Sequence, residues 1–169
     1  MAVEVDPISL KRIETCAPWL RQQLRDILEL LAKRGVRIRI ASAFRSIEEQ
    51  AKLRAKYLKG GPLASPAGLS YHNYGLAVDC VIMKGDKEVV WDIRADLDKD
   101  GKADWLEMVE AFESWGWEAG YRWKGKKCDP PHFQKPFFNT KKGIVRLSEA
   151  ECLSLYTRKK LKDGFLEVA

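Results

Sequence analysis

Histidine is scarce in this sequence, since its 169 residues include only His72 and His132. The four cysteines show no Cys-x-x-Cys spacing, which argues against a zinc site built from thiolates. No apolar stretch approaches the roughly 20 residues that cross a bilayer, so no membrane span is expected. Residues 1–13 lack an apolar segment followed by a small-residue cleavage site, so we expect no secretory signal peptide.

The length and the 46% content of hydrophobic residues fit one compact domain with a single core. The expected elements alternate as in an α+β fold. Leucine and isoleucine spacing predicts a helix through residues 20–31 that stops near Gly35. Ser46 and Glu49 form a capping box that opens a helix to about Leu58. Strands are expected at residues 36–40, 76–83, 88–91, 121–123 and 132–134, and another helix at residues 105–114.

Each histidine lies in a distinctive string: SYHNYGLAVD at residues 70–79 and DPPHFQ at residues 129–134. Two imidazoles and the Asp79 carboxylate make a three-ligand set that leaves one position of a zinc ion open for water. Asp79 is embedded in an apolar run, where an unpaired carboxylate would cost several kcal/mol. A metal would supply its partner, although a core or surface histidine is the commoner role for such a residue.

With the upstream string SAFRS at residues 42–46, these motifs resemble the zinc peptidases that cut peptidoglycan stem peptides. This is the D-alanyl-D-alanine carboxypeptidase and L-alanyl-D-glutamate endopeptidase family, whose fold is shared with the hedgehog signalling domain. The resemblance covers residues 36–135 and implies a small central antiparallel sheet with helices packed on it. It also implies that His72, Asp79 and His132 bind Zn²⁺, and that Arg45 binds substrate and helps to stabilise the oxyanion.

Asp129 is the candidate general base, because it lies three residues before His132, where many relatives carry a glutamate. A turn residue before two prolines is the alternative role for Asp129, and Glu118 is a less favoured rival for the base. Gln50 and Ser70 are assigned with Arg45 to the substrate. Core positions are expected for the aromatic residues Trp115, Trp117, Tyr121 and Trp123, which receive no role in the site.

A second motif follows the pattern of an EF-hand calcium loop, with acidic residues at positions one, three, five, nine and twelve and glycine at six. Helix capping by an acidic turn is the alternative explanation. The candidate Ca²⁺ ligands are Asp96, Asp98, Asp100, Lys102 through its carbonyl, Asp104 and Glu107.

The resemblance implies a zinc metallopeptidase of the phage-lysin type, an L-alanyl-D-glutamate endopeptidase. A D-alanyl-D-alanine carboxypeptidase and a non-catalytic wall-binding zinc domain are the alternatives. Residues 1–135 would form the catalytic domain, with a core at about 36–135, and residues 136–169 a basic helical extension packed on it. A monomer is expected, held in the host cytoplasm until it is released to the peptidoglycan.

The C-terminal residues 135–169 carry eight basic and four acidic side chains, and so most of the net charge of +6. Such an excess favours anionic wall polymers or lipopolysaccharide as partners, while a solvated helix face explains it equally well. No nucleic-acid-binding motif accompanies the charge, so nucleic acid is not expected as a partner.

Overall fold

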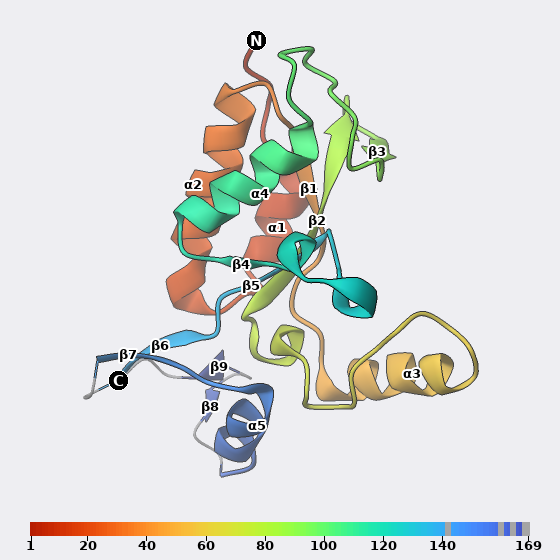
Figure 1. Ribbon diagram of the computed structural model, residues 1–169. Helices are drawn as coiled ribbons and strands as arrows, with labels where there is room; N and C mark the ends of the chain where they lie inside the picture. The colour runs from red at the N-terminus through yellow and green to blue at the C-terminus, as the bar shows by residue number, and fades with distance from the viewer. Residues whose placement is uncertain (141–142, 159–160, 163–164, 167–169) are drawn as a thin grey trace.

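A central antiparallel sheet organises the molecule (Figure 1). The computed structural model describes residues 1–140, 143–158, 161–162 and 165–166. The strand order is β1-β2-β5-β4, and β3 also pairs with β2. The expected α+β fold is therefore confirmed. The strands are β1 (Ile38–Ser42), β2 (Ala77–Lys84), β3 (Glu88–Val90), β4 (Glu118–Ala119) and β5 (His132–Gln134).

Strand β2 is the centre of the sheet, because it has partners along both of its edges. One edge pairs with β1. The other pairs with β5 near the start of β2 and with β3 near its end. A register shift between Ile40 and Ser42 places Ser42 opposite Asp79, and Asp79 in turn is opposite His132. The end of β1 thus meets the starts of β2 and β5.

Three helices cover the sheet on one side: α1 (Pro7–Ile13), α2 (Pro18–Lys33) and α4 (Asp104–Ser114). The predicted apolar stripe of α2 is confirmed, since Leu20, Leu24, Ile27 and Leu31 are fully buried. Full burial of such a side chain stabilises the fold by about 1.5–3 kcal/mol. Gly35 follows the helix with φ 94°, a conformation that favours glycine.

Helix α3 (Ile47–Leu58) extends away from the other helices in Figure 1. Its predicted capping box is present: the Ser46 hydroxyl accepts the Glu49 amide at 3.0 Å, and the Glu49 carboxylate accepts the Ser46 amide at 2.9 Å. The helix ends at the predicted residue. It therefore begins right after the segment that carries Arg45.

Two strand predictions were inaccurate. β1 begins two residues later than expected, at Ile38. The strand predicted at residues 121–123 is wrong, because residues Gly120–Arg122 form a 3₁₀ turn, η2, closed by a bond from the Trp123 amide to the Gly120 carbonyl. In this segment of the described chain, the ladder with β5 is limited to Glu118 and Ala119. Alternation of side-chain type could not reveal that the chain turns away after two ladder residues.

The C-terminal extension is only partly helical, which corrects the expectation of a helical segment. Its helix is α5 (Glu149–Thr157), and the remaining elements are strand pairs: β6 (Phe137–Thr140) with β7 (Gly143–Arg146), and β8 (Leu161–Lys162) with β9 (Phe165–Leu166). Phe138 and Cys152 belong to the same hydrophobic core as α2 and the sheet. Within the described ranges, no helix combines the length and the apolar character that a membrane crossing requires.

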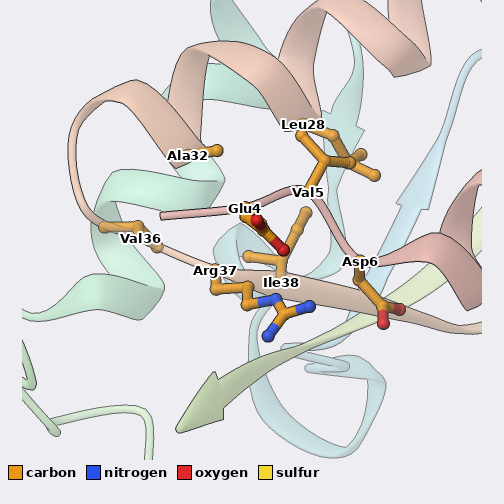
Figure 2. Close-up of a pocket in the computed structure, with 8 residues that line it drawn as sticks. All are labelled: Glu4, Val5, Asp6, Leu28, Ala32, Val36, Arg37 and Ile38. Atoms are coloured by element: carbon orange, nitrogen blue, oxygen red, sulfur yellow. The ribbon is translucent and has the colours of Figure 1, made fainter. Parts of the chain in front are cut away.

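A shallow hollow between the N-terminal segment, α2 and β1 is shown in Figure 2. Its residue Glu4 is exposed, while its buried acidic residue, Asp6, already has hydrogen-bond partners. The carboxylate caps α1 by accepting from Ser9 and accepts two bonds from Arg39, at 2.9 and 3.0 Å. Burial alone would raise the pKa of Asp6, but these hydrogen bonds lower it. The hollow is therefore part of the structural framework and contains none of the predicted site residues.

Candidate metal centre

The structure brings His72, Asp79 and His132 together, as the sequence predicted. Each offers one ligand atom, and the three atoms lie within 4.8 Å of one another. Asp79 Oδ1 is 3.3 Å from His72 Nε2 and 3.2 Å from His132 Nδ1. His72 is on the 3₁₀ helix η1 (Tyr71–Tyr74), Asp79 on β2 and His132 on β5. Three separate elements thus converge on one carboxylate oxygen.

The outer nitrogen of each imidazole has an oxygen acceptor. His72 Nδ1 lies 2.7 Å from the Ala43 carbonyl, and His132 Nε2 lies 2.8 Å from the Gln134 amide oxygen. Because an oxygen acceptor requires a proton on the facing nitrogen, His72 Nε2 and His132 Nδ1, the nitrogens beside Asp79, are the ring atoms left to bind a cation. Two nitrogens and one carboxylate oxygen suit a zinc ion, and three protein ligands leave a coordination position free.

The electrostatics of this cluster favour an ionised carboxylate. Burial would raise the pKa of Asp79, but hydrogen bonds and charge interactions with His132 and His72 hold it well below its usual range. Burial would lower the pKa of His132, whereas its hydrogen bond to Asp79 raises it. The three groups therefore stabilise one another, and a divalent cation would replace the proton that they share.

Local backbone features set the direction of His72. The Ser70 hydroxyl accepts the His72 amide at 3.3 Å and caps η1. Gly75 ends η1 in a left-handed conformation with φ 68°, which any residue with a Cβ adopts at a cost. The register shift in β1 turns the chain so that the Ala43 carbonyl meets the His72 ring. Ser70, predicted to bind substrate, is placed here as a capping residue.

Arg45 lies beside His72, since its amide donates to the His72 carbonyl at 3.0 Å. Its guanidinium donates to Gln50 Oε1 at 2.9 Å and to Ser42 Oγ at 3.2 Å. Gln50 is buried, and its amide nitrogen donates to the Ser65 carbonyl. Gln50 therefore holds Arg45 in place, and only the partly exposed Arg45 is accessible to a substrate.

Asp129 and Glu118 differ in how their carboxylates are occupied. Glu118 accepts from Arg146 and from Gln134. Asp129 is exposed, and among the residues that the structure describes its carboxylate accepts no hydrogen bond. Partial desolvation and the charge of Asp79 raise the pKa of Asp129. Of the two candidates, only Asp129 has a free carboxylate near the cluster, which is what a general base requires.

Trp123 was assigned to the core, but the structure places it beside the cluster. Its ring centroid lies 5.4 Å from that of His132, and its side chain is only partly buried. Gln134 was also missed, although it is two residues after His132 on the same strand and therefore on the same face of the sheet. That spacing was the signal that could have identified Gln134. Trp117 is buried in the core, as expected.

The predicted calcium loop forms two overlapping acidic groups between β3 and α4. Asp96, Asp98 and Asp104 make one, and Asp98, Asp100 and Glu107 the other, with ligand atoms within 4.8 Å in each group. Gly101, at the sixth position, has φ 92°. The Lys102 ammonium pairs with Glu110 outside the loop. All five predicted carboxylates thus belong to one group or the other, with Asp98 common to both.

Glu107 is the unusual member of the loop. Its side chain is 7% exposed, and its Oε2 atom has no hydrogen-bond partner in the described chain. Burial and the charges of Asp100, Asp98 and Asp104 raise the pKa of Glu107 to about 7. Burial and neighbouring aspartates also raise the pKa of Asp104, to about 6. A buried oxygen without a partner costs about 1–3 kcal/mol or more, which a cation would offset.

Comparisons with known proteins agree with this geometry. A family model described as D-alanyl-D-alanine carboxypeptidase matches residues 64–135. The peptidoglycan L-alanyl-D-glutamate endopeptidase CwlK of Bacillus subtilis (strain 168) is 38% identical over 120 residues, which cover 69% of this chain and 71% of that protein. The matched family segment contains His72, Asp79, Asp129 and His132, whereas Arg45 lies before it.

Two solved structures share the fold. The L-Ala D-Glu endopeptidase ChiX of Serratia marcescens has a TM-score of 0.50 and 24% identity, and the match covers 76% of this chain and 86% of that one. A variant of the vancomycin-resistance D,D-pentapeptidase VanY, from a VanB-type cassette and in complex with Zn(II), has a TM-score of 0.50 and 19% identity. That match covers 70% of this chain and 71% of the other.

Proposed function

Since the chain belongs to the D-alanyl-D-alanine carboxypeptidase family of zinc peptidases, we propose that it hydrolyses the L-alanyl-D-glutamate bond of peptidoglycan stem peptides. The observation that carries the proposal is the convergence of one nitrogen from each imidazole and a carboxylate oxygen of Asp79 within 4.8 Å, beside the unoccupied carboxylate of Asp129. The 38% identical relative is named for cleavage of this same bond, which favours it over the D-alanyl-D-alanine bond.

The residues divide the chemistry among them. His72, Asp79 and His132 would hold zinc, which when bound supplies Lewis-acid polarisation of a carbonyl group and acidifies water. Asp129, with its raised pKa, is suited to accept a proton from the attacking water and to return it to the leaving amine. Arg45, fixed by Gln50 and Ser42, presents a planar cation that can bind a substrate carboxylate or an oxyanion.

Mass spectrometry of muropeptides released from purified sacculi tests the bond that is cut. An L-alanyl-D-glutamate endopeptidase leaves L-alanine on the muramic acid and frees a peptide that begins with D-glutamate. A D-alanyl-D-alanine carboxypeptidase would release only terminal D-alanine. A wall-binding domain would release no muropeptides. If zinc-loaded protein sediments with sacculi but releases none, the enzymatic proposal fails.

We further propose that the acidic loop binds Ca²⁺. The support is the buried, partnerless Glu107 Oε2 among the carboxylates of Asp98 and Asp100. Oxygen ligands in this number suit calcium. Asp96, Asp98, Asp100 and Glu107 would contribute side-chain oxygens, with Asp104 and the Lys102 carbonyl as the remaining predicted ligands. A capped acidic turn without an ion would leave the buried Glu107 oxygen unexplained.

Hydrogen bonds connect the acidic loop to the segment beside the zinc cluster. Trp105 follows the loop residue Asp104, and its indole Nε1 donates to the Pro130 carbonyl at 3.1 Å. Pro130 is next to Asp129, and the adjacent Pro131 carbonyl accepts the Cys80 amide at 2.8 Å. An ion that orders the acidic loop would therefore steady the segment that carries the general base.

Calorimetric titration of the zinc-loaded protein with calcium tests this second site. Wild type should bind one calcium ion, and Asp98→Asn should bind far more weakly, because Asp98 belongs to both acidic groups. The matched control is Asp86→Asn, which alters an exposed aspartate paired with Arg37 outside the loop. Equal, absent heats from wild type and Asp98→Asn would reduce the loop to a capped acidic turn.

The lytic role and location are parts of the same proposal. The proposed role is that of a phage lysin, freed from the host cytoplasm at the time of lysis. The basic C-terminal residues 135–169 are proposed to bind anionic wall polymers or lipopolysaccharide. Several of their charges, including those at 141–142 and 159–160, lie outside the described residues. Sedimentation with sacculi at low and high salt tests this binding, which screening should weaken.

A further inference from the structure

A chain of hydrogen bonds connects His132 to the C-terminal hairpin. His132 Nε2 lies 2.8 Å from Gln134 Oε1, and Gln134 Nε2 donates to Glu118 Oε1 at 3.1 Å. Arg146 donates to the same carboxylate, from Nη2 at 3.2 Å and from Nε at 3.3 Å. The segment that the family model matches ends before Arg146.

The strand register explains why these residues meet. His132 and Gln134 are two residues apart on β5, so their side chains share one face of the sheet. Glu118 on β4 is the direct cross-strand partner of Gln134. Arg146 reaches this face from β7, and its guanidinium also lies 5.7 Å from the centroid of the Tyr71 ring. The end of β7 is therefore anchored beside both histidines.

The donor and acceptor properties of these groups fix the direction of each hydrogen bond between Arg146 and His132. An ionised Glu118 only accepts hydrogen bonds, so the Gln134 amide must turn its NH₂ toward Glu118 and its oxygen toward His132. That oxygen also only accepts, so His132 must carry its proton on Nε2. Nδ1, the nitrogen that faces Asp79, is then the ring atom that can bind a cation when the cation displaces the proton shared with Asp79. The hydrogen bonds from Arg146 keep Glu118 oriented.

We propose that Gln134, Glu118 and Arg146 are positioning residues that fix the tautomer of His132, and that the C-terminal hairpin thereby takes part in building the metal site. The inference rests on the proposed function only in taking Nδ1 as the zinc donor. Without the Glu118 carboxylate, the Gln134 amide is free to turn over and present its NH₂ to the ring. The opposite tautomer would then be favoured, with no lone pair on Nδ1.

The decisive variant is Glu118→Gln, because it keeps the size and shape of the side chain but removes its strict acceptor character. Its matched control is Glu113→Gln, which alters another arginine-bound glutamate, paired with Arg122 at 3.0 Å outside the chain of bonds. Arg146→Met removes the end of the chain and should act in the same direction, but more weakly.

The first measurement is the tautomer of His132 in metal-free protein, read from nitrogen-15 NMR of the imidazole rings at about pH 9, well above the usual pKa of histidine. Only two rings contribute, and a His72→Gln variant assigns them. Wild type and Glu113→Gln should show His132 protonated at Nε2, the nitrogen that faces Gln134, whatever the proton on the Asp79 side. Glu118→Gln should show a mixture of rings with and without the Nε2 proton.

The second measurement is the zinc dissociation constant, obtained by competition with a chromophoric chelator. Glu118→Gln should weaken zinc binding by roughly tenfold to a hundredfold, the scale typical of groups that orient a metal ligand, and Glu113→Gln should leave it unchanged. An unaltered tautomer or an unaltered zinc affinity in Glu118→Gln overturns the inference. Failure of wild type to bind zinc would instead overturn the proposed function, while the tautomer measurement still decides the inference.

Discussion

The zinc cluster and the acidic loop both gather carboxylates at partly buried positions, yet they differ in what surrounds each carboxylate. In the cluster, Asp79 lies between two imidazoles, and its pKa is lowered despite burial. In the loop, Glu107 faces Asp98 and Asp100, and its pKa is raised to about 7. Both carboxylates lose contact with solvent. The imidazoles compensate this cost for Asp79, whereas the like charges around Glu107 leave it uncompensated.

This difference separates the zinc cluster, which is organised without a metal, from the proposed calcium loop, whose repelling charges an ion would stabilise. The two histidine rings are held without any metal by their contacts with the Ala43 carbonyl, the Gln134 amide oxygen and the Asp79 carboxylate, which all act as acceptors. The loop instead concentrates like charges around an unpartnered Glu107 oxygen. We therefore expect removal of zinc to abolish chemistry with little effect on folding, and removal of calcium to lower stability first.

His72→Ala should have the largest effect, because it deletes one of three ligands. We expect zinc binding weaker by more than a hundredfold, a larger loss than for groups that only orient a ligand, and no detectable release of muropeptides. Chelator competition and sacculus digestion measure the two effects. Circular dichroism should show the wild-type fold. A folded His72→Ala protein that retains full zinc occupancy would remove His72 from the ligand set.

Asp129→Ala should leave zinc binding intact and slow hydrolysis by roughly 10²–10⁴-fold, the usual contribution of a general acid–base group. Asp129→Glu keeps a carboxylate and should lose less. The comparison variant is Glu118→Gln, which the structure predicts to act on zinc affinity, since Glu118 is bound to Arg146 and Gln134. If Asp129→Ala digests sacculi at the wild-type rate, another group must be the base.

The acidic loop predicts that the metal-free protein becomes less stable as the pH rises. The raised pKa values, about 7 for Glu107 and about 6 for Asp104, mean that the folded, metal-free protein holds protons that the unfolded chain has lost. The contribution of these two carboxyl groups to the free energy of unfolding should therefore fall as the pH rises from about 4 to 7. Calorimetric melting at several pH values measures this fall, with Glu107→Gln as the variant that reduces it.

Calcium should reverse that trend, because it binds the ionised carboxylates. At a concentration about a hundredfold above its dissociation constant, mass action adds about 2.7 kcal/mol to the free energy of unfolding. For a chain of this length the melting temperature should rise by about 5–10 °C. If calcium does not change the melting temperature at neutral pH in either wild type or Asp98→Asn, the loop is an ordinary acidic turn.

Trp105→Phe should have the smallest effect, since it removes only the hydrogen bond between the two regions. The expected loss of stability is about 1 kcal/mol. Calcium binding and zinc binding should each persist, but calcium should no longer raise the rate of hydrolysis. Rates with and without calcium, compared between wild type and this variant, measure the coupling. A rate that responds equally to calcium in both proteins would show that the contact does not transmit it.

Much of the fold followed from local patterns in the chain. The α2 stripe, the Ser46–Glu49 capping box and the apolar run of β2 depend on neighbouring residues, and each was predicted within a residue or two. The 3₁₀ turn after Ala119 and the β6–β7 hairpin were missed. They depend on where a strand loses its partner, which is a property of the sheet and not of the segment.

The sequence by itself determined the composition of the candidate site: two imidazoles, Asp79, Asp129 and an acidic loop, because residue type and motif spacing specify which donors are present. Only the tertiary structure decided how they are used. It directed His132 Nδ1 to Asp79 and paired Glu118 with Arg146. It also hydrogen-bonded Arg45 to Gln50 and placed Trp123 beside His132. The contacts of His132 with Asp79 and of Glu118 with Arg146 join segments far apart in the chain, and strand register and packing alone bring those segments within hydrogen-bonding distance.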